Sequence, residues 1–308
     1  MEPQRTLARA VTTRGIGVHS GRPVRVSVLP APSGRAIAFV RTDLQGSPWI
    51  PARADHVVET TLATTLGAGR ARVSTVEHLL AALAGLGIDN AVVEVDGPEI
   101  PILDGSAAPW MTLLRAAGRV DLDAPRQALV VDRRVVLTEG PREIAVEPAG
   151  RFEVRYEIDF GHVVIPPQTL DLAVDAQTFA EELAPARTFG FLAEVEVLKA
   201  RGLARGGSLE NAIVVGRDRI LNPEGLRFAD EFVRHKALDL VGDLALLSRP
   251  IRGRVTVARG GHRLHNRLVA ALLADSSAWH LEGEAAPARR RRERARPRIG
   301  IEPSPVPA

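Results

Sequence analysis

The segment DEFVRHKALDLVGD (residues 230–243) carries side chains that could bind a metal at a regular spacing. His235, Asp239 and Asp243 are each four residues apart, so on a helix they would share one face. Apolar residues flank them, which indicates partial burial, and buried charges need a metal or a partner. A histidine and an aspartate at this spacing can hold one metal ion, whereas an exposed face with an ion pair is the alternative.

A second segment, STVEHL (residues 74–79), places an acid next to a histidine. Its serine and glutamate fit a capping box at a helix start, which would give Glu77 a structural role. The alternative makes His78 a third metal ligand and Glu77 a general base. Two histidines and one aspartate would leave a tetrahedral zinc ion an open position for water, whose pKa zinc lowers to roughly 7. A half-buried histidine without a metal is the other interpretation of His78.

Two further residues could act on a substrate. His262 follows two glycines at a predicted strand end, where backbone can approach a ligand closely. It could protonate a leaving amine, or it could be an ordinary turn histidine. Lys236 is one of only two lysines among 40 basic residues. Because this chain uses arginine almost everywhere else, a lysine beside His235 suggests a compact ammonium group directed at a substrate oxygen.

The elements that must position these residues fall into two similar sets. Each half of the chain is predicted to contain strands, a helix, another strand and a second helix. The helices are expected at 75–86 and 107–117 in the first half, and at 230–247 and from 267 onward in the second. This weak internal repeat predicts an α+β fold of two domains with similar topology, each a β-sheet packed against helices. The active site is then expected at the domain interface.

A polar, proline-containing stretch at residues 121–126 is the expected linker between the domains. The predicted divisions are an N-terminal domain at 1–122, a C-terminal domain at 127–282 with an insert near 193–215, and a tail at 283–308. The tail is rich in arginine and proline and is expected to be disordered.

Composition excludes several classes of protein. The chain has no cysteine, so disulfides, thiolate zinc sites and cysteine nucleophiles are all excluded. The sequence pI of about 10.0 would suit nucleic-acid binding, but residues 281–308 hold seven arginines and four acids and so carry the whole formal net charge of +3. We therefore expect no nucleic-acid partner for the body, while the basic tail could contact RNA or anionic lipid.

The expected location is the cytoplasm. The N-terminus lacks the apolar core that a signal peptide needs. The longest apolar stretch, around residues 79–86, is too short to span a bilayer.

Taken together, these segments resemble one family, the UDP-3-O-acyl-N-acetylglucosamine deacetylases of lipid A biosynthesis. The resemblance covers roughly residues 4–280 and rests on long motifs in both halves. The matching segments are GIGVHSG (15–21), RTDL (41–44), STVEHL (74–79), GLGIDN (85–90), EIPILDGSAAP (99–109), ARTFGF (186–191), RGGS (205–208), LN (221–222), GLRF (225–228), the segment 230–243 and GH (261–262).

The resemblance implies a zinc-dependent hydrolase that releases acetate from UDP-3-O-acyl-N-acetylglucosamine, the committed step of lipid A (lipopolysaccharide) biosynthesis. The implied zinc ligands are His78, His235 and Asp239. The implied catalytic residues are Glu77 as general base, His262 as general acid, Asp243 as its orienting partner, and Thr188 and Lys236 as oxyanion donors. The implied substrate contacts are His19, Phe160, Phe189, Phe191, Lys236 and Arg259, with an apolar passage for the acyl chain in residues 193–215.

Three features depart from the family pattern. The chain has no cysteine near the passage, Gly161 follows Phe160 where a polar residue is expected, and the basic tail has no counterpart. Acyl-chain length and the role of the tail stay open, as does the native metal, since such a site also accepts iron(II). A monomer is expected, with at most transient membrane contact. The alternatives are a zinc amidase for another acylated sugar, a nucleic-acid-binding protein that acts through its tail, and a metal-free scaffold.

Overall fold

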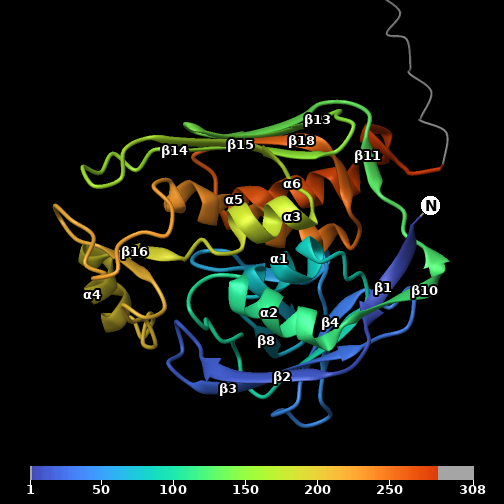
Figure 1. The fold of residues 1–308 in the computed structure, drawn as a ribbon, viewed down its shortest axis with the longest axis horizontal. Helices are drawn as coiled ribbons and strands as arrows, with labels where there is room; N and C mark the ends of the chain where they lie inside the picture. Colours follow the sequence, from blue (N-terminus) through green and yellow to red (C-terminus); the bar gives the residue numbers. More distant parts are fainter. Residues whose placement is uncertain (1, 284–308) are drawn as a thin grey trace, which may run out of the picture.

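Two layers of helices lie back to back between two β-sheets in the computed structural model, which describes residues 2–283 (Figure 1). In the first half of the chain, helices α1 and α2 cover one sheet, and in the second half α5 and α6 cover the other. The two halves meet where α1 packs against α5. This arrangement of sheets packed against helices confirms the α+β fold class. The helices are α1 (Glu77–Gly85), α2 (Ala108–Ala117), α3 (Ala176–Thr178), α4 (Leu192–Ala200), α5 (Glu231–Leu244) and α6 (His262–Ala274).

The first sheet has five strands in the order β2-β3-β9-β4-β5, antiparallel except for the β4–β9 pair. Val24, Val26 and Val28 of β3 are buried while their neighbours are more exposed, so alternation places one face of the sheet on the core. A three-stranded sheet, β6-β7-β8, leads into α1. The strands are β2 (Val11–Ile16), β3 (Pro23–Pro30), β4 (Ile37–Arg41), β5 (Trp49–Pro51), β6 (Val57–Glu59), β7 (Thr65–Ala68), β8 (Ala71–Val73) and β9 (Ala91–Val95).

The second sheet has seven strands and is built around β18, which pairs with β11, β13 and β14. Val255 and Val257 of β18 are fully buried against the helices. This strand ends at Ala258, so its C-terminal end delivers the chain directly to α6 and His262. The strands are β11 (Leu129–Val131), β12 (Val135–Glu139), β13 (Arg142–Glu147), β14 (Phe152–Ile158), β15 (Gln168–Ala173), β18 (Ile251–Ala258) and β19 (Trp279–Leu281).

Smaller elements complete the chain. Strands β16 and β17 form a parallel pair that, with α4, projects from one end of the molecule (Figure 1). Asp175 caps α3, which continues into a short π-helical turn. The remaining elements are β1 (Pro3–Leu7), β10 (Arg119–Pro125), β16 (Phe189–Phe191), β17 (Ile213–Val215), the π-helix Phe179–Leu183, and the 3₁₀ helices Ala54–His56, Ala245–Leu247 and Ser276–Ala278.

Three local predictions were wrong. The expected linker at 121–126 is mostly strand β10, which pairs with β1. Helix α6 begins at His262, not near residue 267, with Gly261 as its N-cap. The predicted capping box does not form, because α1 begins at Glu77 and its N-cap Val76 makes no side-chain cap. The predicted tail lies outside the described residues, apart from Gly283.

The contact between α1 and α5 depends on a glycine. A Cβ atom at position 242 would lie 2.1 Å from the backbone oxygen of Glu77, which is closer than real atoms approach. Gly242 therefore lets the two helices touch at the residue that begins α1.

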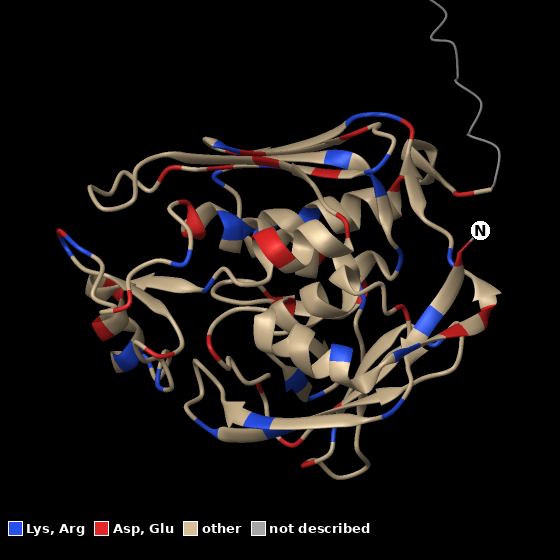
Figure 2. Ribbon diagram, viewed as in Figure 1, with Lys and Arg blue, Asp and Glu red and all other residues tan. Residues whose placement is uncertain are grey.

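Charged side chains of both signs are spread over the part of the chain that the structure describes. Lys and Arg are interspersed with Asp and Glu over both halves in the view of Figure 2. Within residues 2–283 no helix combines the length and the apolar character needed to cross a bilayer.

Candidate metal and active site

Three buried side chains from the two central helices converge where α1 meets α5. The Nε2 atoms of His78 and His235 lie 3.5 and 3.4 Å from Oδ1 of Asp239. The imidazole rings are 5.0 Å apart and nearly perpendicular. The i, i+4 spacing on α5 brings His235 and Asp239 together, and α1 supplies His78 from the other half of the chain. This group can hold a metal ion.

The surroundings of the three ligands suit a cation. Oδ1 of Asp239 is buried and has no hydrogen-bond partner among the described residues, whereas Oδ2 accepts one from Lys236 Nζ at 2.7 Å. Nδ1 of His235 lies 3.1 Å from the carbonyl oxygen of Ala186, which leaves Nε2 free to face Asp239. A buried carboxylate oxygen without a partner is costly unless a cation binds it, so the donor set fits a metal ion.

Protonation states point the same way. Burial lowers the pKa of His235 to about 4, so its ring is neutral as a metal ligand must be. Burial opposes ionisation of Asp239, but His235 and Lys236 hold its pKa well below the ordinary value. Burial likewise disfavours the charged form of Lys236, yet the Asp239 carboxylate raises its pKa above the ordinary value. The site thus presents a neutral imidazole and an ionised carboxylate.

Glu77 lies beside this group as the first residue of α1. Its Oε2 accepts a hydrogen bond from the backbone N–H of Thr64 at 3.1 Å, and its Oε1 lies 3.8 Å from Nε2 of His262. The side chain is buried, and burial raises its pKa. A carboxylate with a raised pKa accepts a proton more readily, as a general base requires.

His262 is held by a chain of buried polar groups. Its Nδ1 lies 2.8 Å from Oδ2 of Asp243, and Nδ1 of His265 lies 2.8 Å from the same oxygen. Nε2 of His265 lies 3.0 Å from the hydroxyl of Tyr156, and the Thr64 hydroxyl donates to Oδ1 of Asp243. Because these groups already satisfy one another, the cluster needs no ion, although three of its members have ligand spacing.

The charges around His262 favour its cationic form. Burial alone would lower the pKa of His262, but the carboxylates of Asp243, Glu77 and Asp239 raise it to about 9. Burial also disfavours the charge on Asp243, whereas the two histidines lower its pKa to about 2. The pair is an imidazolium and a carboxylate near neutral pH, with Nε2 of His262 directed toward Glu77 and Asp239.

The segment that precedes β16 is anchored to the start of α5. Arg187 is buried and pairs with fully buried Glu231 at 2.9 Å. Glu231 also accepts the backbone N–H of Arg187 at 3.0 Å. This anchor positions Ala186, whose carbonyl orients His235, and Thr188, whose N–H donates to Gly105 at 2.8 Å.

Aromatic side chains lie next to the metal ligands. The rings of Phe160, Phe189 and Phe191 are 5.6 to 6.4 Å apart, and Phe189 lies 6.2 Å from the ring of His235. Phe160 is 41% exposed, so the cluster offers an accessible apolar surface. Val197 and Leu209 of the insert, and Leu192 directly before it, are also exposed.

Arg259, His19 and Thr188 contact residues outside the group formed by His78, His235 and Asp239. Arg259 follows β18 and pairs with Asp159 at 2.8 Å, beside Phe160. His19 donates its backbone N–H to the buried Glu99 at 2.9 Å, and its buried Nδ1 has no partner within residues 2–283. The Thr188 side chain is half-buried.

The sequence did not predict that the cluster around Asp243 also contains His265, Tyr156 and Thr64. Only His265 leaves a local signal, because it stands three residues after His262 and so shares its side of a helix. Tyr156 and Thr64 reach the site from distant strands and loops, and no spacing in the sequence reveals them.

Comparisons with known proteins match most of the chain. A family model described as UDP-3-O-acyl N-acetylglycosamine deacetylase matches residues 4–274. The chain is 52% identical over 288 residues to the UDP-3-O-acyl-N-acetylglucosamine deacetylase of Myxococcus xanthus (strain DK1622), covering 94% of this chain and 90% of that protein. Proteins of the same name in Anaeromyxobacter dehalogenans (strain 2CP-C) and Phenylobacterium zucineum (strain HLK1) are each 51% identical, over 93% and 90% of this chain and 94% and 96% of theirs.

Proposed function

The chain belongs to the UDP-3-O-acyl N-acetylglycosamine deacetylase family, and we propose that it removes the N-acetyl group from UDP-3-O-acyl-N-acetylglucosamine in lipid A biosynthesis. The observation that carries this proposal is that a candidate metal site, a buried base and a buried acid lie together. His78, His235 and Asp239 form the first, and Glu77 and His262 flank it.

The proposed metal is zinc, held by His78, His235 and Asp239. Three nitrogen and oxygen ligands with one open position are the usual arrangement of hydrolytic zinc sites. When bound, the ion would polarise the amide carbonyl and lower the pKa of an adjacent water.

Glu77 would act as the general base. Its buried carboxylate removes a proton from the attacking water, whose oxygen then bonds to the acetyl carbon. The hydrogen bond from Thr64 holds one carboxylate oxygen in place, so the other faces the reacting atoms. General bases of this kind contribute about 10² to 10⁴ in rate.

His262 would act as the general acid. When the carbon–nitrogen bond breaks, the imidazolium Nε2 donates its proton to the departing amine, and acetate is the other product. Asp243 holds Nδ1 and keeps Nε2 directed inward. Lys236 and Thr188 are proposed to stabilise the oxyanion, Lys236 with donors left over from its bond to Asp239.

Substrate recognition is proposed to use both ends of the ligand. The aromatic surface of Phe160, Phe189 and Phe191 would contact the acyl chain, which the insert at 193–215 would enclose. His19 would contact the sugar nucleotide, and Arg259 its diphosphate. We further propose a monomeric cytoplasmic enzyme of two domains, 1–122 and 127–282, with at most transient membrane contact.

The test measures metal content and acetate release together on protein purified without chelator. The expected result is about one zinc per chain and release that a chelator abolishes. Bound zinc without acetate release would reject this substrate, and acylated sugars lacking UDP would then identify a related amidase. Deletion of residues 283–308 tests the alternative of a nucleic-acid-binding protein. If the deletion abolishes salt-sensitive RNA binding but leaves deacetylation unchanged, RNA binding is a property of the tail alone.

A further inference from the structure

A cavity of about 600 Å³ lies between the two halves, away from the metal ligands. It is lined by Leu80 and Leu83 of α1 and by Val241 and Leu244 of α5, together with the segments that link the two sheets. None of the candidate site residues lines it. Its volume falls within the range of small-molecule sites in proteins.

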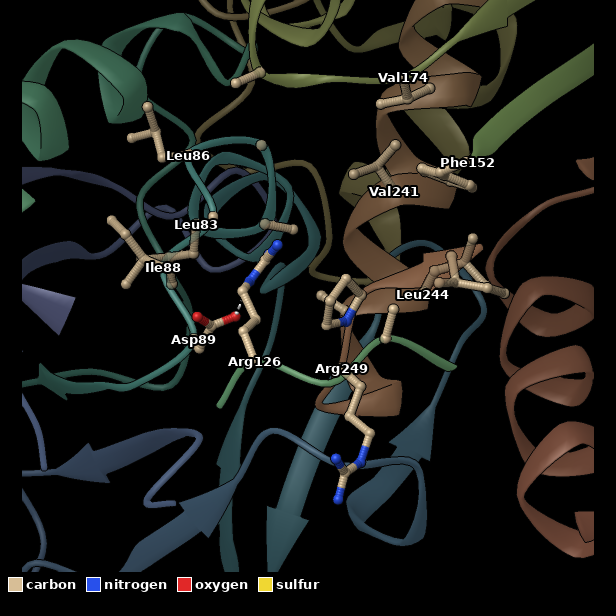
Figure 3. A pocket seen from close by; sticks show the side chains of 18 of the residues that line it. Leu83, Leu86, Ile88, Asp89, Arg126, Phe152, Val174, Val241, Leu244 and Arg249 are labelled. Carbon is tan, nitrogen blue, oxygen red and sulfur yellow. Dashed lines mark hydrogen bonds and ion pairs between the residues drawn. The ribbon is translucent and has the colours of Figure 1, made fainter. Parts of the chain in front are cut away.

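The walls of the cavity are apolar on both sides. Figure 3 shows Leu83, Leu86 and Ile88 from the first half facing side chains of the second half across the gap. The facing residues are Phe152, Val174, Val241 and Leu244. An aliphatic chain placed between these walls would bury apolar surface from both halves.

The polar lining is positive. Six arginines and four carboxylates line the cavity. Three carboxylates are already paired with lining arginines, as Asp89 is with Arg126 at 2.8 Å and Glu282 with Arg252 at 2.7 Å. The fourth, Asp175, accepts backbone hydrogen bonds at the start of α3. Arg249 also lines the cavity and forms no ion pair with any described residue, and Figure 3 shows its guanidinium pointing away from the apolar side chains, so it is available to an anion.

We propose that this cavity binds a single-chain amphiphile with an anionic phosphate or carboxylate head. The chain would lie between the apolar walls, and Arg249 would hold the head, since a guanidinium pairs well with such oxygens. The surplus of arginine over carboxylate excludes a cationic head. The site is separate from the deacetylation centre.

The test is a calorimetric titration of the full chain with dodecyl phosphate below its micelle concentration. Dodecyltrimethylammonium serves as the cationic probe with the same chain. Ala84→Phe would fill the cavity from α1, with Ala116→Phe, at an exposed position of α2, as its matched control. Arg249→Glu would reverse a rim charge, with Arg70→Glu outside the cavity as its control.

We expect dodecyl phosphate to bind and the ammonium probe to fail. Ala84→Phe and Arg249→Glu should each weaken binding about tenfold, while both controls and Phe191→Ala bind as the unchanged chain does. The proposal would be overturned if the two probes bound equally well. It would also be overturned if Phe191→Ala lost binding and Ala84→Phe kept it, because the amphiphile would then bind at the aromatic surface. Acetate release is measured separately, so failure here leaves the proposed deacetylation intact.

Discussion

Asp243 accepts hydrogen bonds from two histidines through one carboxylate oxygen and from Thr64 through the other. All of these groups are buried, so each bond is protected from competition with water. His262 is consequently fixed in orientation and in protonation state by the same carboxylate. A general acid needs both a fixed orientation and a proton to donate.

Replacement of Asp243 by asparagine should therefore shift the pH dependence of the enzyme. Burial lowers the pKa of His262, but Asp243, Glu77 and Asp239 raise it to about 9, so the imidazolium is lost as pH rises through that value. Without the Asp243 charge the pKa falls, and the alkaline limb of kcat should move down by about one pH unit or more. A kcat–pH profile checks this, and an unmoved alkaline limb would remove His262 from the role of acid.

Glu77 offers a test that separates chemistry from metal binding. Glu77→Gln keeps the size of the side chain but removes the proton acceptor, so acetate release should fall about 10² to 10⁴-fold. Zinc content should stay unchanged, because Glu77 is not among the proposed ligands. Glu181→Gln, at an exposed position, is the control and should match the unchanged chain. Loss of zinc together with activity would make Glu77 a ligand instead.

Among the elements, α1 and α5 touch where Gly242 faces the backbone of Glu77. Gly242→Ala places a Cβ 2.1 Å from the Glu77 oxygen, so the helices must separate. We expect a loss of roughly 1–3 kcal/mol in the free energy of unfolding, measured by urea denaturation, together with reduced activity. Gly150→Ala, where an added Cβ meets nothing within 4 Å, is the control. Equal stability of the two variants would contradict the close approach.

The periodicity of the sequence predicted that the helices bearing the candidate site residues exist, but it predicted less well where each helix begins. The spacing of His235, Asp239 and Asp243 correctly predicted one buried helix face, because i and i+4 residues are neighbours on any helix. The capping box failed because Thr75 adopts a left-handed conformation, with φ +58°, and the helix starts only at Glu77. The side chain of Glu77 instead lies next to His262, which belongs to the second half of the chain.

Local sequence patterns did not predict which residues far apart in the chain contact each other. Strand β10 looked like a linker since it is polar, but it pairs with β1 at the opposite end of its half. Tyr156 likewise meets His265 across 109 residues. Contacts of this kind depend on the completed fold, and only the family resemblance named the candidate site residues of both halves together.

For the molecule as a whole, a bound ion would join the two halves, since His78 precedes β10 and the other two ligands follow it. Zinc should therefore raise the unfolding temperature, with about 2.7 kcal/mol of added stability when free zinc is 100 times its Kd. Thermal scans with and without zinc measure this. His235→Ala should abolish the effect, and His56→Ala, outside the site, should keep it. A zinc shift that survives in His235→Ala would place the ion elsewhere.

The division of the site between the halves has a practical consequence. Residues before β11 supply Glu77 and His78, and residues after it supply His235, Asp239 and His262, so neither portion of the chain holds all of the proposed site. Two separately produced fragments, broken after Pro125, would each be inert, and turnover would appear only as they bind each other. Acetate release would then measure the association of the two fragments. The fold could therefore serve as a split-enzyme reporter, in which the rate of the enzyme's own reaction is the signal.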